Sequence, residues 1–359
     1  MKYIIFSYDY PPNNGGISRL CGEIRKELLR RGHQVSVITG IPGDSSPEII
    51  RVSGRRGILE IRMLKALKDV YKPGDIIITD TWHPAGSLAL LVSKDVFILA
   101  HGAELLPGSG YANTSLWKSY RKRIMAKACG VIANSEYTAG LVKSCSPKAN
   151  VLSLPLAIDG SFFHPTKPKI TSDDILRVCS LSRLEKFKGH DFVIKTIATL
   201  PDEYKKRIRF EIGGKGPYSE ELKKLVSELG LNDIVTFKGF MPDSEVLDFY
   251  SANDVFILCT REELNLQNVE GFGLVFTEAQ ACGTAVIGTR TGGIPSAVTD
   301  GVGGWLIEQD NTQELMFLLI KAVDNKPKIR EEGLVARNRV LAELNWEKYG
   351  DELINFTTK

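Results

Sequence analysis

The sequence predicts an α/β protein built from two doubly wound domains. Short runs rich in Ile and Val alternate with amphipathic stretches, and this alternation stops at a proline-containing segment and then begins again. Such apolar strands separated by helices indicate parallel sheets covered on both faces. The length of 359 residues is sufficient for two domains of ordinary size. We therefore expect two Rossmann-like domains that face each other across a cleft.

The first domain is expected to span residues 1–163. Amphipathic helices are predicted at Ser18–Arg31 and Leu59–Tyr71, between short apolar strands. The predicted strands are Tyr3–Tyr8, Gln34–Thr39, Asp75–Thr81, Val96–Ala100 and Gly130–Asn134.

The second domain is expected to span residues 164–344, after a linker at 160–170 that contains Pro165 and Pro168. The segment 345–359 has its aromatic and Leu side chains on one side, so we expect it to form a helix that packs back on the first domain. The strands predicted in the second domain are Leu176–Leu181, Arg207–Ile212, Ile234–Lys238, Asp254–Leu258 and Ala285–Gly288.

Composition is typical of a globular protein, with 43% hydrophobic and 25% charged residues. The six cysteines contain no C-x-x-C pair, so we expect reduced thiols and a cytoplasmic protein. Residues 1–163 hold 21 Lys/Arg against 13 Asp/Glu, a balance of +8, and the remainder has a balance of −5. A basic first domain indicates an anionic partner, such as the inner face of the cell membrane, and nothing indicates a nucleic acid. The basic stretch Trp117–Lys127 fits a helix on that membrane, or an ordinary helix with its apolar side in the core.

The run Glu-Gly-Phe-Gly-Leu-Val-Phe-Thr-Glu, from Glu270 to Glu278, carries the clearest chemical signal. Because glycine is unfavourable inside a helix, we expect a loop carrying Glu270 and then a helix from about Gly273 to Cys282, capped by Gly283. The start of such a helix favours anions, and carboxylates accept hydrogen bonds from hydroxyls. A nucleotide sugar offers such groups in order, with hydroxyls on its sugar, then a diphosphate, then hydroxyls on its ribose. The other interpretation is an acidic helix start that only complements the helix dipole.

Glycine-rich turns follow several predicted strands. Gly15 and Gly16 allow the backbone to approach a phosphate closely, although a plain turn with Ser18 as N-cap fits equally well. Gly214 lies in a second turn of this kind, and we expect the backbone of a third strand end, near Met241, to contact the edge of a base, although each of these segments alone is also typical of an ordinary turn.

Two cations and one histidine stand at the carboxyl ends of strands, where open α/β sheets bind ligands. Arg183 and Lys188 follow the first strand of the second domain and are suited to clamp a diphosphate. The other interpretation is a solvated charge run. His101 follows Val96–Ala100 and is a candidate for contact with the substrate. No group of side chains has the spacing of metal ligands, so we expect no metal and no cofactor, with these cations and helix dipoles meeting the phosphate charge.

Taken together, these motifs resemble the retaining glycosyltransferases of family 4, which have the GT-B fold. The resemblance covers nearly the full length of the chain. Within the family, the sequence is similar to the phosphatidylinositol mannosyltransferase branch. The resemblance implies that Glu270 holds sugar hydroxyls, that Glu278 binds the ribose, and that His101 contacts the sugar. It further implies that Arg183 and Lys188 stabilise charge on the departing phosphate. The remaining donor-binding residues that it implies are Gly15, Gly16, Gly214, Met241, Phe272, Gly273, Leu274 and Val275.

The expected function is the transfer of a hexose, with mannose favoured, from a nucleotide diphosphate sugar to a hydroxyl of a lipid-linked or glycan acceptor. GDP-mannose is the favoured donor, and a UDP-sugar is the alternative. Two other functions remain open, a nucleotide-sugar 2-epimerase on the same fold and a non-catalytic nucleotide-sugar binding module. The polar loop 261–269 ahead of Glu270 means that sugar selectivity cannot be taken from the family.

Overall fold

The computed structural model describes residues 1–107, 113–169 and 173–358. The chain divides into two compact units. The first comprises residues 1–156, 265–267 and 346–359, and the second comprises residues 157–264 and 268–345. The change from one unit to the other lies a few residues earlier than the boundary expected after residue 163.

The first unit contains a seven-stranded parallel sheet in the order β3-β2-β1-β4-β5-β6-β7. All residues of its central strands β4 and β5 are buried, as expected for a parallel sheet covered on both faces. Its elements are β1 (Lys2–Ser7), α1 (Gly16–Arg30), β2 (Gln34–Thr39), β3 (Ile49–Arg51), α2 (Ile58–Val70), β4 (Ile76–Thr79), α3 (Ser87–Ala89), β5 (Val96–Ala100), α4 (Ser115–Lys127), β6 (Gly130–Ala133), α5 (Glu136–Cys145), β7 (Val151–Ser153) and α14 (Trp346–Thr357), with short helical turns at Trp82–Gly86 and Ala103–Leu105.

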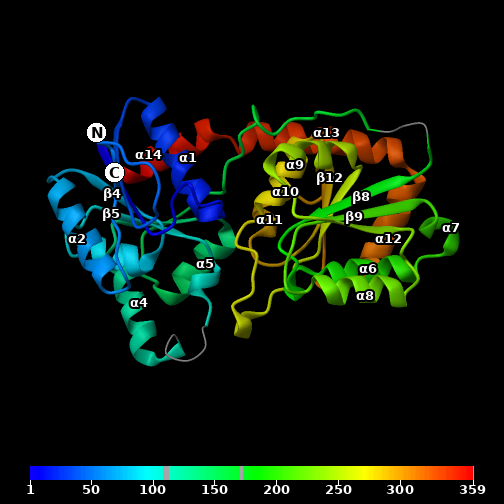
Figure 1. The fold of residues 1–359 in the computed structure, drawn as a ribbon, viewed down its shortest axis with the longest axis horizontal. Helices are drawn as coiled ribbons and strands as arrows, with labels where there is room; N and C mark the ends of the chain where they lie inside the picture. Colours follow the sequence, from blue (N-terminus) through cyan, green and yellow to red (C-terminus); the bar gives the residue numbers. More distant parts are fainter. Residues whose placement is uncertain (108–112, 170–172, 359) are drawn as a thin grey trace. The chain divides into compact units, whose positions relative to one another are not determined.

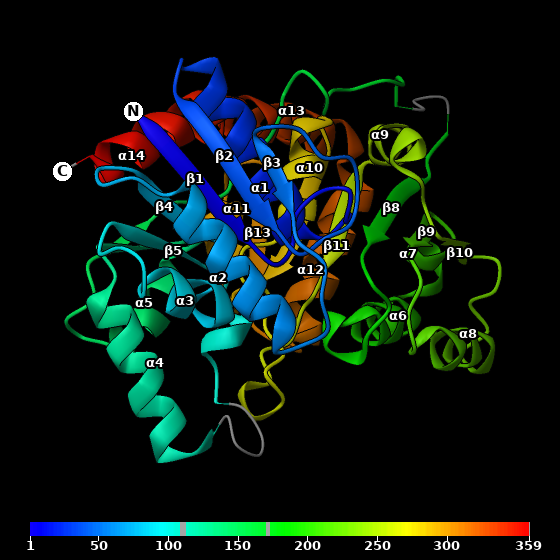
Figure 2. The ribbon, with the colours of Figure 1, turned by 60° about the vertical axis from the view of Figure 1, so that its left-hand side comes forward.

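Alternate residues of β1 point to opposite faces of this sheet. Ile4 and Phe6 join the core formed with α2, α3, α4 and α5. On the other face, the hydroxyl of Tyr3 lies 3.1 Å from Oγ1 of Thr357 in α14. Helix α14 lies beside α1 in both views (Figures 1 and 2). The C-terminal segment therefore packs within the first unit.

The second unit contains a six-stranded parallel sheet in the order β10-β9-β8-β11-β12-β13. Helices α6, α8 and α12 cover one face, and α9, α10 and α13 lie on the other (Figure 1). Its elements are β8 (Leu176–Leu181), α6 (His190–Thr199), α7 (Asp202–Lys205), β9 (Ile208–Gly213), α8 (Ser219–Glu228), β10 (Val235–Gly239), α9 (Asp243–Ala252), β11 (Val255–Leu258), α10 (Leu274–Ala281), β12 (Ala285–Thr289), α11 (Ile294–Ala297), β13 (Gly304–Ile307), α12 (Thr312–Asp324) and α13 (Lys326–Glu343), with 3₁₀ turns at Lys186–Lys188 and Leu264–Leu266.

Both sheets have the strand order 3-2-1-4-5-6, and the first adds a seventh strand at its end. The direction of winding reverses between β1 and β4 in the first unit and between β8 and β11 in the second. Ligands of open α/β sheets bind beyond the carboxyl ends of the strands at such a reversal. The topology therefore directs attention to the loops that follow these four strands.

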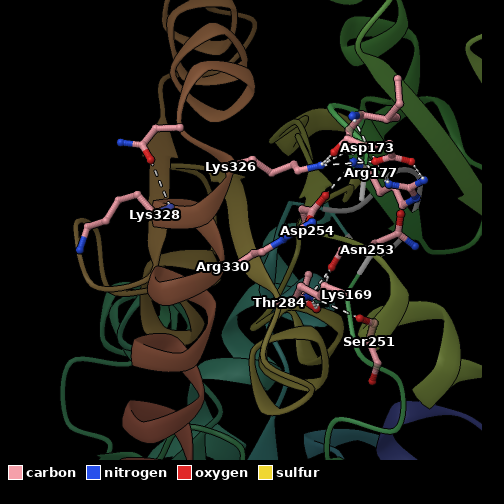
Figure 3. A network of polar contacts seen from close by, with 12 residues as sticks. Lys169, Asp173, Arg177, Ser251, Asn253, Asp254, Thr284, Lys326, Lys328 and Arg330 are labelled. Atoms are coloured by element: carbon pink, nitrogen blue, oxygen red, sulfur yellow. Dashed lines mark hydrogen bonds and ion pairs between the residues drawn. The ribbon is translucent and has the colours of Figure 1, made fainter. Parts of the chain in front are cut away.

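The segment that leads into the second unit is fastened to the opposite, amino-terminal edge of its sheet (Figure 3). The ammonium of Lys169 donates to the carbonyl oxygen of Asn253 and, at 3.2 Å, to Oγ1 of Thr284. Close by, the guanidinium of Arg330 lies 2.8 Å from the carboxylate of Asp254. Burial lowers the pKa of Lys169 to about 8. These contacts fix this part of the linker to the second unit.

Candidate active site

An ion pair joins two loops at the reversal point of the second sheet. Nζ of Lys188, in the loop after β8, lies 2.7 Å from Oε2 of Glu270, in the segment after β11. The two side chains are only 13% and 18% exposed, so both charges are largely withdrawn from water. A half-buried ammonium beside a carboxylate can bind an anion with one group and hydroxyls with the other.

The loop that carries Lys188 is held by close backbone packing and by Arg261. A Cβ atom placed on Gly189 would lie 1.9 Å from the carbonyl oxygen of Cys259, so glycine is required here. The guanidinium of Arg261 donates to both carboxylate oxygens of Asp191, at 2.8 and 3.1 Å. Its backbone N–H donates to the carbonyl of Phe187 at 2.6 Å. Arg261 therefore connects the loop after β8 to the beginning of the segment that leads to Glu270.

The backbone of Glu270 is held by the loop after β12. The N–H of Gly293 donates to the carbonyl of Glu270 at 2.7 Å. A Cβ atom on Gly292, whose φ is +52°, would lie 2.4 Å from that carbonyl oxygen. The hydroxyl of Thr291 donates to the carbonyl of Thr260 at 2.7 Å, which ties the same two loops together. Glycine is therefore needed at position 292 for this close approach.

Helix α10 begins directly after the glycine turn, as the sequence predicts. Gly273 is its N-cap in the left-handed conformation, with φ of +94°, and Gly283 follows its C-terminal end with φ of +75°. The first backbone N–H groups of Leu274 and Val275 lie in the first turn, where an α-helix has no internal acceptor for them. The ring of Phe272 is buried, so only its backbone is placed to contact a ligand.

Glu278 lies one turn further along α10 and is oriented by a buried tyrosine. The hydroxyl of Tyr250 in α9 donates to Oε2 of Glu278 at 3.1 Å. Burial raises the pKa of Tyr250, and the nearby Glu278 carboxylate raises it further. The phenol therefore stays protonated and donates to Glu278, which fixes the orientation of this carboxylate.

The loops after β8 and β9 pack on each other through glycine. A Cβ atom on Gly214, with φ of +117°, would lie 1.8 Å from the carbonyl oxygen of Ser182. Arg183 is on the same loop as Lys188, but its side chain is 78% exposed and it pairs with Glu185 at 3.1 Å. The structure therefore brings Lys188 and Glu270 together and leaves Arg183 at the rim of the loop.

In the first unit, a buried carboxylate organises the corresponding reversal point. Oδ2 of Asp80, directly after β4, accepts from the Ser7 hydroxyl at 2.9 Å and from the N–H of Tyr8 and Asp9 at 2.6 and 2.9 Å. Burial raises the pKa of Asp80, and these hydrogen bonds oppose that rise. Asp80 thereby fixes the turn that leads from β1 toward the glycine pair.

Helix α1 begins at Gly16, with Gly15 as its N-cap, and both glycines are exposed. The alternative in which Ser18 caps the helix is wrong. The hydroxyl of Ser18 instead donates to the carbonyl of Asn13 at 2.7 Å from inside the first turn, and Ser18 is buried. The exposed glycines at the start of α1 carry no side chain of their own, and nothing lies within 4 Å of the place of a Cβ on Gly16, whereas a carboxylate oxygen of Asp9 lies 3.1 Å from the place of a Cβ on Gly15.

His101 follows β5 and is held by two backbone contacts. Its Nε2 lies 2.7 Å from the carbonyl oxygen of Asp80, and its N–H donates to Oε1 of Glu104 at 2.7 Å. Because a carbonyl only accepts, Nε2 carries a proton. Among the residues that the structure describes, none hydrogen-bonds the other ring nitrogen, Nδ1.

The buried side chain of His190 should make the stability of the protein depend on pH. Burial, and to a smaller extent the nearby Lys188 charge, lowers the pKa of His190 to about 3. The unfolded chain takes up this proton near pH 6.5 and the folded chain does not, so stability falls as the pH falls below 6.5. Between pH 7 and pH 5 we expect a loss of about 2 kcal/mol from this group. Urea unfolding of wild type and of His190→Gln at both pH values checks it, since the variant should lack this part of the loss.

Sequence reasoning did not find Arg261, Asp191, Tyr250 or Asp80. These residues act on other site residues through hydrogen bonds between segments far apart in the chain. Only Asp80 had a local signal, because a carboxylate directly follows an apolar strand at the reversal point of the sheet.

Two family models match the chain, one in each half. The model for glycosyl transferases group 1 matches residues 165–337, and the model for glycosyltransferase family 4 matches residues 14–160. Among curated proteins, a GDP-mannose-dependent alpha-(1-6)-phosphatidylinositol monomannoside mannosyltransferase of Mycobacterium tuberculosis is 25% identical over 99% of this chain and 97% of its own length. A GDP-mannose-dependent monoacylated alpha-(1-6)-phosphatidylinositol monomannoside mannosyltransferase of Corynebacterium glutamicum is 27% identical, again over 99% of this chain and 97% of its own length.

Among solved structures, HepE of Anabaena in complex with UDP has a TM-score of 0.79 with 18% sequence identity, covering 100% of both chains. The fold and the sequence matches define a glycosyltransferase of the GT-B class. Within that class, the chain belongs to the group 1 glycosyltransferases that carry the family 4 N-terminal domain.

Proposed function

We propose that the protein is a retaining glycosyltransferase that moves a hexose, with mannose favoured, from a nucleotide diphosphate sugar to a hydroxyl of a lipid-linked or glycan acceptor. The observation that supports this most is the Lys188–Glu270 pair, which lies at the reversal point of the second sheet. In the proposed complex, Lys188 and the start of α10 bind the diphosphate, and Glu270 binds sugar hydroxyls.

The chemistry of the step follows from the charges on these residues. The bond between the anomeric carbon and the phosphate oxygen breaks, and negative charge develops on the departing diphosphate. An ammonium that is already fixed beside that oxygen stabilises the charge without reorganising. The acceptor hydroxyl attacks from the same face as the leaving phosphate, and its proton passes to that phosphate. Arg183, exposed at the rim, is proposed to join the diphosphate only when the donor is bound.

GDP-mannose is the favoured donor because the two curated relatives named above are GDP-mannose-dependent enzymes that act on inositol lipids. A UDP-sugar is the alternative, since the Anabaena structure contains UDP.

A thermal-shift screen of nucleoside diphosphates and their sugars identifies the donor. A ligand at 100 times its dissociation constant should stabilise the fold by about 2.7 kcal/mol. Incubation of the stabilising donor with an inositol-lipid acceptor should then yield a glycosylated lipid whose anomeric configuration, read by NMR, equals that of the donor. An inverted product would contradict retention. Conversion of the nucleotide sugar without any acceptor would instead indicate an epimerase.

We further propose that the first unit meets the acceptor at an anionic membrane surface on the cytoplasmic side. Exposed apolar side chains of α2 and α4 stand beside basic ones in this unit. The rings of His83 and Trp117 of α4 are 5.0 Å apart. Burial lowers the pKa of His83, Arg56, just before α2, lowers it further, and Glu60 in α2 raises it. We infer from these neighbours of His83 that α2 and α4 border one surface. We call this the basic apolar face, and its residues are Arg55, Arg56, Ile58, Ile61, Arg62, Leu116, Lys118, Tyr120, Lys122 and Arg123.

Of the two interpretations of Trp117–Lys127, the ordinary helix with its apolar side in the core holds at Ile124. Ile124 is buried in the core of the first unit, so the side of α4 expected to lie on a membrane faces inward at that residue. Leu116 and Tyr120 remain exposed, at 85% and 37%. Among the described residues, no helix could span a bilayer. The proposed contact is therefore with the membrane surface.

Vesicle flotation checks this contact. Wild type should float with vesicles containing phosphatidylglycerol and not with pure phosphatidylcholine, and Ile58→Ser with Ile61→Ser should weaken flotation without altering donor binding. Equal flotation of wild type with both kinds of vesicle, or with neither, would contradict the proposed surface.

A further inference from the structure

His101 connects three neighbouring strand ends at the carboxyl edge of the first sheet. Its ring donates to the carbonyl of Asp80, which follows β4, at 2.7 Å. Its own carbonyl accepts from Nδ2 of Asn134, which follows β6, at 3.3 Å. The strands β4, β5 and β6 lie side by side in the sheet. Any shift of the His101 backbone therefore changes where Nδ1 of the ring points.

A carboxylate fixes the remaining polar group of this backbone. Oε1 of Glu104 accepts from the N–H of His101 at 2.7 Å, and the Glu104 side chain is half-buried. Hydrogen bonds to an ionised acceptor are short and about twice as strong as those between neutral groups. Glu104 lies in the 3₁₀ turn Ala103–Leu105, which begins after Gly102 with φ of +110°. This tight turn brings the carboxylate back to the residue three positions earlier.

A buried arginine holds the turn that carries Glu104. Nη1 of Arg121 in α4 donates to the carbonyl of Glu104 at 3.2 Å, and Arg121 is only 7% exposed. Its Nε has no hydrogen-bond partner among the described residues. A buried guanidinium that is incompletely hydrogen-bonded lowers the stability of the fold, and such exceptions concentrate at functional sites. The contact between Arg121 and this turn therefore indicates a role beyond packing.

We propose that Glu104 and Arg121 are positioning residues that fix His101 for its contact with the substrate. Glu104 holds the backbone of His101 directly, and Arg121 acts through the turn that carries Glu104. This inference rests on the proposed function, and it adds two residues to the site. The atom that they orient is Nδ1, which can accept a hydrogen bond from a sugar hydroxyl because Nε2 already carries the ring proton.

Transfer kinetics of variants at position 104 test the inference. Glu104→Leu should lower kcat/KM about 10- to 150-fold, the factor that corresponds to the loss of one hydrogen bond to a charged group. Glu104→Gln should stay within about fivefold of wild type, because its amide oxygen still accepts from the His101 N–H. The affinity for the nucleoside diphosphate, which lacks the hexose, should be the same in all three proteins.

The same change in the background of His101→Ala separates positioning from a general structural role. If Glu104 acts through the His101 ring, Glu104→Leu should lower kcat/KM by less than about twofold once that ring is absent. An equal factor in both backgrounds would overturn the inference. Arg121→Met should show the same dependence on His101. Lys127→Met, at an exposed position of the same helix, should leave kcat/KM unchanged.

An NMR measurement reports on His101 without any turnover. The signal of its Nε2 proton is assigned through His101→Gln in ¹⁵N-histidine spectra. In wild type this proton should exchange slowly with solvent, because it is bonded to the Asp80 carbonyl. In Glu104→Leu it should exchange about tenfold faster or more, because the backbone that carries the ring is released. Equal exchange rates in the two proteins would contradict the positioning role.

These outcomes also separate the inference from the proposed function. If wild type transfers no sugar but Glu104→Leu speeds the exchange, the positioning of His101 stands and the transferase proposal fails. If wild type transfers sugar and Glu104→Leu transfers it equally well, the positioning role alone fails. If wild type transfers no sugar and the exchange rates are equal, both fail.

Discussion

Replacement of Lys188 by Met should lower kcat for sugar transfer about 10²- to 10³-fold, the loss seen when one fixed donor to a developing negative charge is removed. Two effects combine here. In the proposed complex, the departing diphosphate loses its ammonium partner, and the half-buried Glu270 carboxylate is left without the cation that it contacts at 2.7 Å. Steady-state kinetics with donor and acceptor measures the effect.

Lys186 is the matched control for this variant. It lies in the same 3₁₀ turn, two residues earlier, and its side chain is exposed. Lys186→Met should therefore stay within about threefold of wild type, the order expected for a solvated surface charge. If Lys188→Met also stayed within that range, the assignment of Lys188 to the diphosphate would be wrong.

Replacement of Gly189 by Ala should destabilise the protein by about 3–5 kcal/mol, a size that single substitutions reach only through a specific structural conflict. The residue has φ of +77°, and its new Cβ would lie 1.9 Å from the carbonyl oxygen of Cys259. The backbone must move to relieve this overlap, and the loop that carries Lys188 moves with it. Urea unfolding followed by circular dichroism measures the loss.

A variant at Gly230 separates the effect of steric overlap from the effect of backbone strain. Gly230 also has a positive φ, +66°, but nothing lies within 4 Å of the place where its Cβ would be. Gly230→Ala should therefore cost only the conformational strain, about 1–2 kcal/mol. A Gly189→Ala variant no less stable than Gly230→Ala would show that the close packing of the two loops is not needed.

The sequence predicted the regular elements well where their apolar runs are long. Strands Gln34–Thr39, Val96–Ala100 and Leu176–Leu181 begin and end where predicted. Helix α10 also lies where glycines at both ends placed it, because only glycine readily adopts the positive φ found at positions 273 and 283.

Short strands were not predicted, for a physical reason. β3 and β7 have three residues each, too few to show a periodic pattern, and they exist because neighbouring strands offer hydrogen bonds at the sheet edges. Strand β13 was not predicted either, because it has only four residues and follows a glycine-rich turn.

The candidate site was predicted in part. Sequence motifs indicated both Lys188 and Glu270, but the ion pair between them depends on a contact across 82 residues. The same limit applies to Arg261, whose partner Asp191 lies 70 residues earlier. Such contacts are set by tertiary packing, and no local pattern encodes them.

A crystal structure of the protein soaked with GDP-mannose tests the central claim most directly. The account predicts diphosphate oxygens within hydrogen-bonding distance of Nζ of Lys188 and of the first backbone N–H groups of α10, with Glu270 contacting sugar hydroxyls. Donor bound away from the carboxyl ends of β8 and β11, or a diphosphate that leaves Lys188 untouched, would contradict it.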